Sequence, residues 1–166
     1  MSEIDDDAVV LRLRALGHEL PSPTGTLFDY LPASRYGQTV FIAGQIPKVT
    51  QDSLYAYGAL GTDVTQEEAI FSTELCVLHA LAWIRKLAGN LDHNVERILR
   101  VNFFFQVPEE KFGGMSDIAD AGSRLLVAAL GERGRHPRSV IGVRELPRNA
   151  PVLIDLDVAV KNTPNE

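Results

Sequence analysis

The longest regular pattern of apolar positions in the chain lies within residues 65–89 and predicts a helix. In "TQEEAIFSTELCVLHALAWIRKLAG", one largely apolar face is formed by Ala69, Ile70, Thr73, Cys76, Val77, Ala80, Ile84 and Leu87. Thr65 and Glu68 have the spacing of a capping box, and Gly89 is typical of a C-terminal stop. A similar pattern predicts a second helix over residues 116–130, before Gly131.

Short β-branched and aromatic runs closed by Gly or Pro predict strands instead. These runs are "TVFIAGQIP" (39–47), "ERILRVNFFFQV" (96–107), "RSVIGVREL" (138–146) and "PVLIDLDVAV" (151–160). The segment "LFDYLPAS" (27–34) is a candidate partner strand weakened by Pro32, and the turn-rich segment 54–64 is a candidate short strand.

This order of elements predicts an α+β fold, a mixed β-sheet with two helices packed on one face. Alternation in the last strand places residues 152, 154, 156, 158 and 160 under the helices, and Leu153, Asp155, Asp157 and Ala159 on the other face. Phe41 and Ala43 are expected on that second face. Two helices cannot cover both faces, so a half-apolar face favours a homo-oligomer.

Residues 1–24 are interpreted as an N-terminal extension, and residues 25–162 as the domain itself. Apolar residues recur at helical spacing up to Gly17, which predicts a short helix. The segment "PSPTGT" (21–26) has the composition of a linker.

Composition narrows the classes of function. The 166 residues carry a net charge of −6, which disfavours a nucleic-acid backbone as partner. The single cysteine, Cys76, permits neither an intrachain disulfide nor a thiolate metal cluster. The acidic start "MSEIDDD" does not resemble a signal peptide, and no apolar run approaches membrane-spanning length, so we expect a cytoplasmic protein with no membrane partner.

Candidate chemistry centres on Arg138, which lies where an apolar strand begins. It is either a solvated strand-end charge or a bidentate clamp on a carboxylate. Asp155 and Asp157 share one face and can act as acid–base groups or as salt-bridge partners. The four histidines have no metal-ligand spacing, so no metal site is predicted, and His79 and Cys76 are expected to be packed inside.

Three phrases together resemble one known family. "YGQTVFIAGQIP", "GNLDHNVERILRVNFFFQVPEEKF" and "RHPRSVIGVRELPRNAPVLIDLDVAV" are similar to the RidA/YjgF reactive-intermediate deaminases, also called the L-PSP endoribonuclease family. The wording of the last phrase is similar to a chorismate mutase-like branch. The resemblance implies a homotrimer with small-molecule clefts between subunits and no cofactor.

The resemblance also implies site residues. Arg138 matches the arginine that holds the carboxylate of an enamine or imine derived from an amino acid. Tyr30 matches the N-terminal tyrosine, and Gly44 a glycine that approaches the ligand closely. Three positions depart from the family pattern: Ala43 replaces a serine, Asp120 lies near the asparagine position, and Leu153 replaces the water-orienting glutamate.

Asp155, about 7 Å further along the strand, is the remaining carboxylate that can orient water. We therefore expect a hydrolytic deaminase of small carboxylate-bearing imines, with Arg138 and Asp155 as its catalytic residues. A trimer that binds a small imino, enamino or keto acid without catalysis is the alternative, and ribonuclease activity is disfavoured by the net charge.

Overall fold

The helical pattern of residues 65–89 forms α2 (Gln66–Ala88) in the computed structural model, which describes residues 7–162. The predicted capping box is present. The Thr65 hydroxyl accepts from the Glu68 N–H, and the Glu68 carboxylate accepts from the Thr65 N–H. The second predicted helix is α4 (Met115–Leu130), which starts one residue earlier than expected and ends at Gly131.

Five strands form one sheet in the order β1-β2-β5-β3-β4. Their bounds are β1 Ala33–Tyr36, β2 Thr39–Gln45, β3 Val95–Gln106, β4 Arg138–Val143 and β5 Val152–Val160. β4 pairs with β3 in parallel, and the other neighbours are antiparallel, so the predicted mixed sheet is confirmed. Short helices complete the described chain: α1 Ala8–Ala15, α3 Leu91–Asn94 and the 3-10 turns η1 Gly131–Gly134 and η2 Pro147–Asn149.

Two strand predictions were wrong in part. Residues 27–32 form bends, and only the end of the 27–34 segment joins β1, because Pro32 cannot donate to a ladder. Residues 54–64 form turns with isolated bridges instead of a strand. Gly58 and Gly61 have positive φ angles there, which extended strands do not use.

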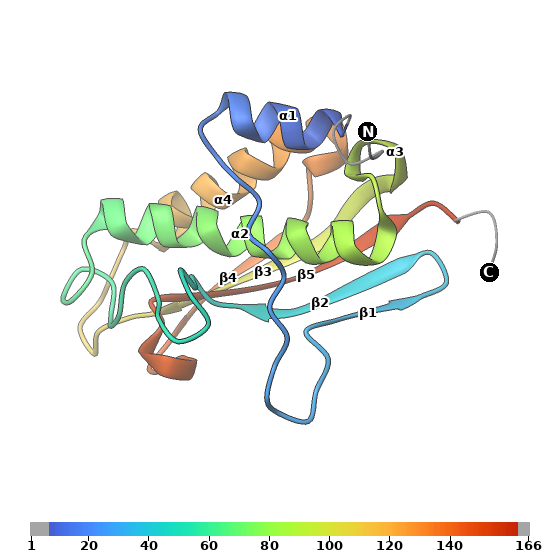
Figure 1. Ribbon diagram of the computed structural model, residues 1–166. Coiled ribbons are helices and arrows are strands. Elements are labelled where there is room, and N and C mark those ends of the chain that lie inside the picture. Colours follow the sequence, from blue (N-terminus) through green and yellow to red (C-terminus); the bar gives the residue numbers. More distant parts are fainter. Residues whose placement is uncertain (1–6, 163–166) are drawn as a thin grey trace.

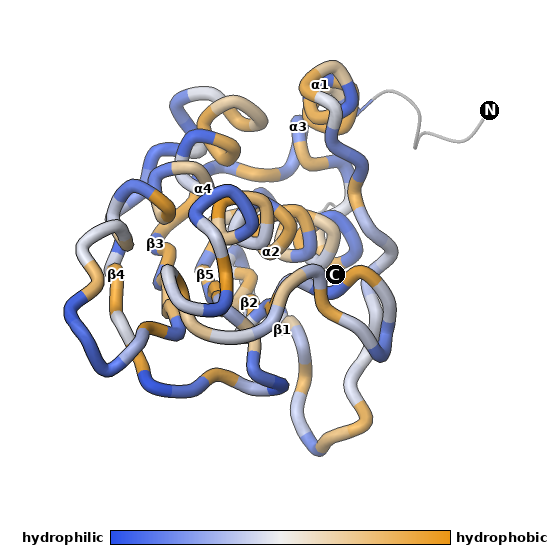
Figure 2. The backbone as a smooth tube through the Cα atoms, turned by 90° about the vertical axis from the view of Figure 1, so that its left-hand side faces the viewer, coloured by the Kyte–Doolittle hydropathy of each residue, from blue (hydrophilic) through white to orange (hydrophobic). Residues whose placement is uncertain are grey.

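The helices lie on one face of the sheet, with α1 over α4 and farther from the strands (Figures 1 and 2). The prediction that alternate residues of β5 lie under the helices is confirmed, since these five residues, from Val152 to Val160, are 0–1% exposed. His79 and Cys76 are buried as expected, and burial raises the pKa of the Cys76 thiol well above its usual value.

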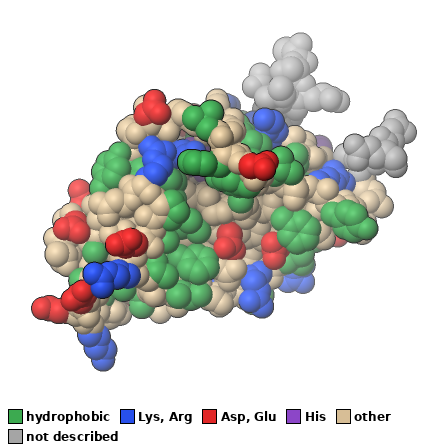
Figure 3. Space-filling view, turned by 90° about the horizontal axis from the view of Figure 1, so that it is seen from below, with side chains coloured by type: hydrophobic (Ala, Val, Ile, Leu, Met, Phe, Trp, Pro, Cys, Tyr) green, Lys and Arg blue, Asp and Glu red, His purple; other side chains and the backbone are tan. Residues whose placement is uncertain are grey.

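In residues 7–162, no α-helix packs on the opposite face of the sheet, which is called here the open face. It presents Leu153, Asp155 and Asp157, with Phe41 aligned against Asp157 in the neighbouring strand. Apolar and charged side chains are interspersed across the underside of the molecule (Figure 3). Phe41 remains 45% exposed in the single chain, although it belongs to a sheet interior rather than to an edge.

The N-terminal segment contributes to the main core through α1. Val9 and Leu13 are fully buried, and α1 packs on α4. Gly17 has a φ of +84°, and its N–H donates to the Arg14 carbonyl, which ends the helix as predicted.

Candidate functional site

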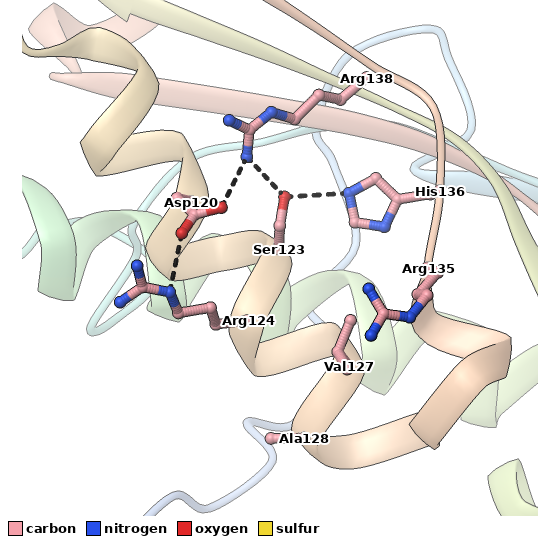
Figure 4. A pocket seen from close by; sticks show the side chains of 8 residues that line it. All are labelled: Asp120, Ser123, Arg124, Val127, Ala128, Arg135, His136 and Arg138. Atoms are coloured by element: carbon pink, nitrogen blue, oxygen red, sulfur yellow. Dashed lines mark hydrogen bonds and ion pairs between the residues drawn. The ribbon is translucent and has the colours of Figure 1, made fainter.

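Arg138 is the first residue of β4, and its side chain reaches across to α4 (Figure 4). Its Nη1 donates to the Ser123 hydroxyl at 3.0 Å and contacts an Asp120 carboxylate oxygen at 3.4 Å, while Nη2 donates to the Ser116 carbonyl at 3.3 Å. The side chain is 27% exposed, and these contacts fix its position, so Arg138 is not a freely solvated strand-end charge.

A guanidinium has five N–H donors, and these contacts use three of them. Within residues 7–162, the other two have no hydrogen-bond partner. Two N–H groups are what a bidentate clamp on a carboxylate requires. Arg138 can therefore still hold a carboxylate ligand through two N–H groups.

A cavity of about 590 Å³ opens beside this arginine. It is lined by Asp120, Ser123, Arg124, Val127, Ala128, Arg135, His136 and Arg138 (Figure 4). Three arginines and one aspartate are among these residues; Arg124 pairs with Asp120 at 2.7 Å, and Arg135 pairs with Glu132 at 2.9 Å. The surplus of arginines among the lining residues favours small anions here, on a chain whose net charge is −6.

Ser123 and His136 form a directed hydrogen-bond chain within the cavity. His136 Nδ1 lies 2.6 Å from the Gly134 carbonyl, which can only accept, so Nδ1 carries the proton. His136 Nε2 lies 3.1 Å from the Ser123 hydroxyl. Desolvation lowers the pKa of His136, which favours the neutral ring. In that form Nε2 accepts, so the Ser123 hydroxyl donates to it while accepting from Arg138.

Gly134 allows this arrangement to form. A Cβ on this residue would collide with the Leu126 carbonyl of α4, so only glycine lets η1 turn this closely against the helix. The turn then delivers the Gly134 carbonyl and His136 to the polar side of α4, directly before β4 begins.

The predicted site residues fall into two groups in one chain. Arg138 and Asp120 meet on the helix side of the sheet. In the pairing register, Arg138 is aligned with Val101, which is fully buried under the helices. Asp155 is aligned with the next residue, Asn102, and therefore faces the open side.

On the open face, Asp155 is half-buried and accepts a 2.7 Å hydrogen bond from Asn102 Nδ2. Desolvation raises the pKa of Asp155, the Asn102 hydrogen bond lowers it, and the nearby Asp157 charge raises it. The net effect is a raised pKa of Asp155, and a carboxyl pKa closer to neutrality favours acid–base catalysis.

Gly44 and Ala43 lie in a β-bulge of β2, where one extra residue opposes β5. The space next to Gly44 is filled by Leu153, whose side-chain carbons would lie 2.7–2.9 Å from a Cβ on residue 44. Leu153 also packs against a small apolar cluster that contains Ile46 and Leu54. The side chain at the glutamate position is thus a packing residue in this chain.

Tyr30 lies outside both groups. It is 53% exposed in the loop before β1, which hangs below the sheet (Figure 1). Leu27, Phe28 and Leu31 in the same loop are 71–95% exposed. Large apolar side chains rarely project together from a surface that nothing covers.

Among residues 7–162, no three His, Cys, Asp or Glu side chains gather closely enough to hold a metal ion. In the same part of the chain, no helix has both the length and the apolarity needed to cross a membrane.

Residues 10–159 match the protein family described as "YjgF/chorismate_mutase-like, putative endoribonuclease". The chain belongs to the YjgF family. It is 30% identical to an endoribonuclease-like protein of Shewanella oneidensis, whose crystal structure superposes with a TM-score of 0.84 over 92% of this chain and 99% of that one. It is also 29% identical to protein TCP17 of Trypanosoma cruzi, over 98% of this chain and all of the other.

More distant YjgF-like structures share the fold. Escherichia coli TdcF is 17% identical and superposes with a TM-score of 0.60 over 85% of this chain and 94% of that one. The α+β architecture inferred from the sequence is therefore the architecture of this family.

Sequence reasoning missed the four other polar residues of the cavity: Ser123, Arg124, Arg135 and His136. One signal for them was present. Asp120, Ser123 and Arg124 are spaced three and four apart on one face of the predicted helix, and His136 lies two residues before Arg138. Nothing in the sequence showed that this helix face and this strand start lie side by side.

Proposed function

We propose that this YjgF-family protein hydrolyses small imines or enamines that carry a carboxylate, releasing a keto acid and ammonia. The main support for this proposal is Arg138. It lies at the wall of a positively charged cavity, and two of its N–H donors have no partner within residues 7–162. A small anion entering the cavity can exchange the long 3.4 Å Asp120 contact for two charge-assisted hydrogen bonds.

The position of the second catalytic group suggests a shared site. Arg138 and Asp155 lie on opposite faces of one sheet, so one chain does not direct both at the same ligand. Asp155 of a neighbouring subunit is the group that we propose to orient water. An open face packed against other copies, with the exposed loop carrying Tyr30 reaching across, would complete the site.

The direct test is an assay of freshly generated imino acids, such as iminopyruvate, with ammonia and keto acid as readouts. Release above the spontaneous rate, lost in Arg138→Lys, supports the proposal. Release at the spontaneous rate contradicts it.

Oligomeric state is the second expected result. Phe41, Tyr36 and the loop around Phe28 leave apolar surface exposed in one chain, and a homotrimer is expected to cover it. Light scattering should give about three times the chain mass of 18.2 kDa. A monomer at micromolar concentration would contradict both the trimer and the shared site.

Mixed trimers test the shared site itself. Arg138→Lys and Asp155→Asn are each expected to be nearly inactive alone. After the two are unfolded and refolded together, some interfaces combine an intact Arg138 with an intact Asp155, so activity should reappear. Mixing without unfolding is the control, and no recovery in mixtures that refold to trimers would contradict a site shared between subunits.

A non-catalytic binder is the second candidate, and a specific observation favours it. Leu153 is packed against Gly44 where the family resemblance implies a glutamate, so this position cannot relay a proton. Such a binder would bind pyruvate or 2-oxobutyrate in calorimetry, depend on Arg138, and release no ammonia. Net charge argues against the endoribonuclease activity that the family description mentions.

A further inference from the structure

The cavity holds a serine–histidine pair that imine hydrolysis does not use. We propose that Ser123 is a nucleophile, activated by His136, that cleaves small esters whose acyl part carries a carboxylate. This inference is independent of the proposed deaminase activity, although both reactions would use the same cavity.

The direction of the hydrogen bonds around Ser123 supports its role as a nucleophile. Serine side chains inside helices commonly donate back to a carbonyl of the preceding turn. Ser123 does not, because its hydroxyl proton points to His136 Nε2 at 3.1 Å. The Gly134 carbonyl, 2.6 Å from Nδ1, fixes the tautomer that leaves Nε2 free to accept. A nucleophile, a base and a group that orients the base are therefore in line.

The positive charge next to Ser123 supports the same role. Arg138 Nη1 donates to the Ser123 oxygen from 3.0 Å, so a cation adjoins the atom that would become the alkoxide. The same guanidinium lies beside the place where an oxyanion would form when the hydroxyl attacks a carbonyl. Burial lowers the pKa of His136, the hydrogen bond to Gly134 raises it, and the charge of Arg138 lowers it. The resulting neutral base can take a proton near pH 7.

The lining of the cavity indicates the class of substrate. Val127 lies one helical turn after Ser123, and Ala128 lies beyond it, so the cavity has an apolar part that suits a short aliphatic acyl chain. Arg135 and Arg124 at the rim, 66% and 81% exposed, can turn towards a terminal carboxylate. A half-ester of a short dicarboxylic acid combines these features.

The reaction balances without a cofactor. The Ser123 oxygen attacks the ester carbonyl carbon and its proton passes to His136 Nε2. The carbon–oxygen bond to the alcohol then breaks, and the leaving oxygen takes that proton. Water next attacks the acyl-serine, gives a proton to His136, and the Ser123 oxygen leaves with that proton. The products are the dicarboxylic acid and the alcohol.

The test uses mono(4-nitrophenyl) succinate as the probe and 4-nitrophenyl acetate for comparison. The wild type should release a burst of nitrophenolate with the succinate ester, faster than with acetate, and peptide mass spectrometry should find a succinyl group on Ser123. Ser123→Ala should lose both the burst and the adduct. His136→Gln should slow acylation about 100-fold or more, because a general base typically contributes at least that factor.

Matched control variants distinguish acylation at Ser123 from acylation of other residues on the surface. Ser139→Ala removes a hydroxyl on the opposite face of the same strand, and His93→Gln removes an exposed imidazole on α3. Both should acylate like the wild type. Thermal melting of every variant checks its fold, and His136→Gln keeps the test decisive if Ser123→Ala does not fold.

The pH dependence of the acylation rate is a further test, because a purely structural role of His136 would not produce it. The acylation rate should rise as His136 loses its proton, with a midpoint below the usual histidine pKa of 6.5. The charged groups around the ring are Arg138 on β4, Arg135 near it in the chain, and Asp120 and Arg124 on α4.

An unchanged burst in Ser123→Ala, or succinyl groups only on other residues, would overturn the proposal. Ammonia release from imines, measured separately, stays a test of the deaminase alone.

Discussion

Arg138→Lys is expected to weaken the binding of small carboxylates by about 2–5 kcal/mol, although the positive charge is kept. Lysine has no planar pair of donors, so it cannot replace the two N–H groups that Arg138 has left for a ligand. It also cannot keep the contacts to Ser123 and Ser116 in the same geometry. Calorimetric titration of pyruvate or 2-oxobutyrate should show dissociation constants raised about 30-fold to several thousand-fold.

Arg144→Lys is the matched control for this experiment. Arg144 follows the end of the same strand, is 80% exposed, and pairs with Glu109 at 3.2 Å. The Lys variant there should bind carboxylates like the wild type. Equal affinities for the wild type and Arg138→Lys would make Arg138 a structural arginine and remove the carboxylate clamp from the proposed function.

Asp7→Ala is expected to lower the free energy of unfolding by about 3 kcal/mol, because it removes a buried carboxylate that serves three donors. Asp7 is 1% exposed and accepts from the N–H groups of Val9 at 3.1 Å, Leu91 at 2.7 Å and Asp92 at 3.3 Å. It caps α1 and α3 together, and Arg85 Nε lies 3.7 Å away. Alanine would leave these three N–H donors without their acceptor next to the core.

Urea denaturation at one fixed protein concentration measures this loss, since the apparent stability of an oligomer depends on concentration. Asp52→Ala removes the same charge from an exposed loop and should change stability by no more than about 0.5 kcal/mol. A loss no greater than that in Asp7→Ala would show that the N-terminal helix is dispensable for the fold.

The sequence by itself determined the elements whose side chains repeat with a clear period. α2, α4, β3 and β5 were predicted because a buried helix face or strand face leaves its period in the sequence. The apolar run that follows Arg138 placed this residue at the start of β4, and the family resemblance added its expected role. The order of the elements predicted the layers that the structure shows. Irregular segments were predicted poorly, as residues 27–34 show, because a lone strand signal next to proline does not specify a partner.

Only the tertiary structure decided which polar groups meet. Ser123 and His136 are 13 residues apart, and their contact depends on Gly134 letting η1 turn against α4. Arg138 and Asp155 were grouped by sequence, yet alternation along paired strands puts them on opposite faces of the sheet. Periodicity records which side of an element is buried, whereas the crossing of two elements and the register of paired strands depend on contacts distant in the chain. The sequence therefore determined the scaffold and the position of Arg138, and the packing of α4 against the start of β4 decided the cavity around it.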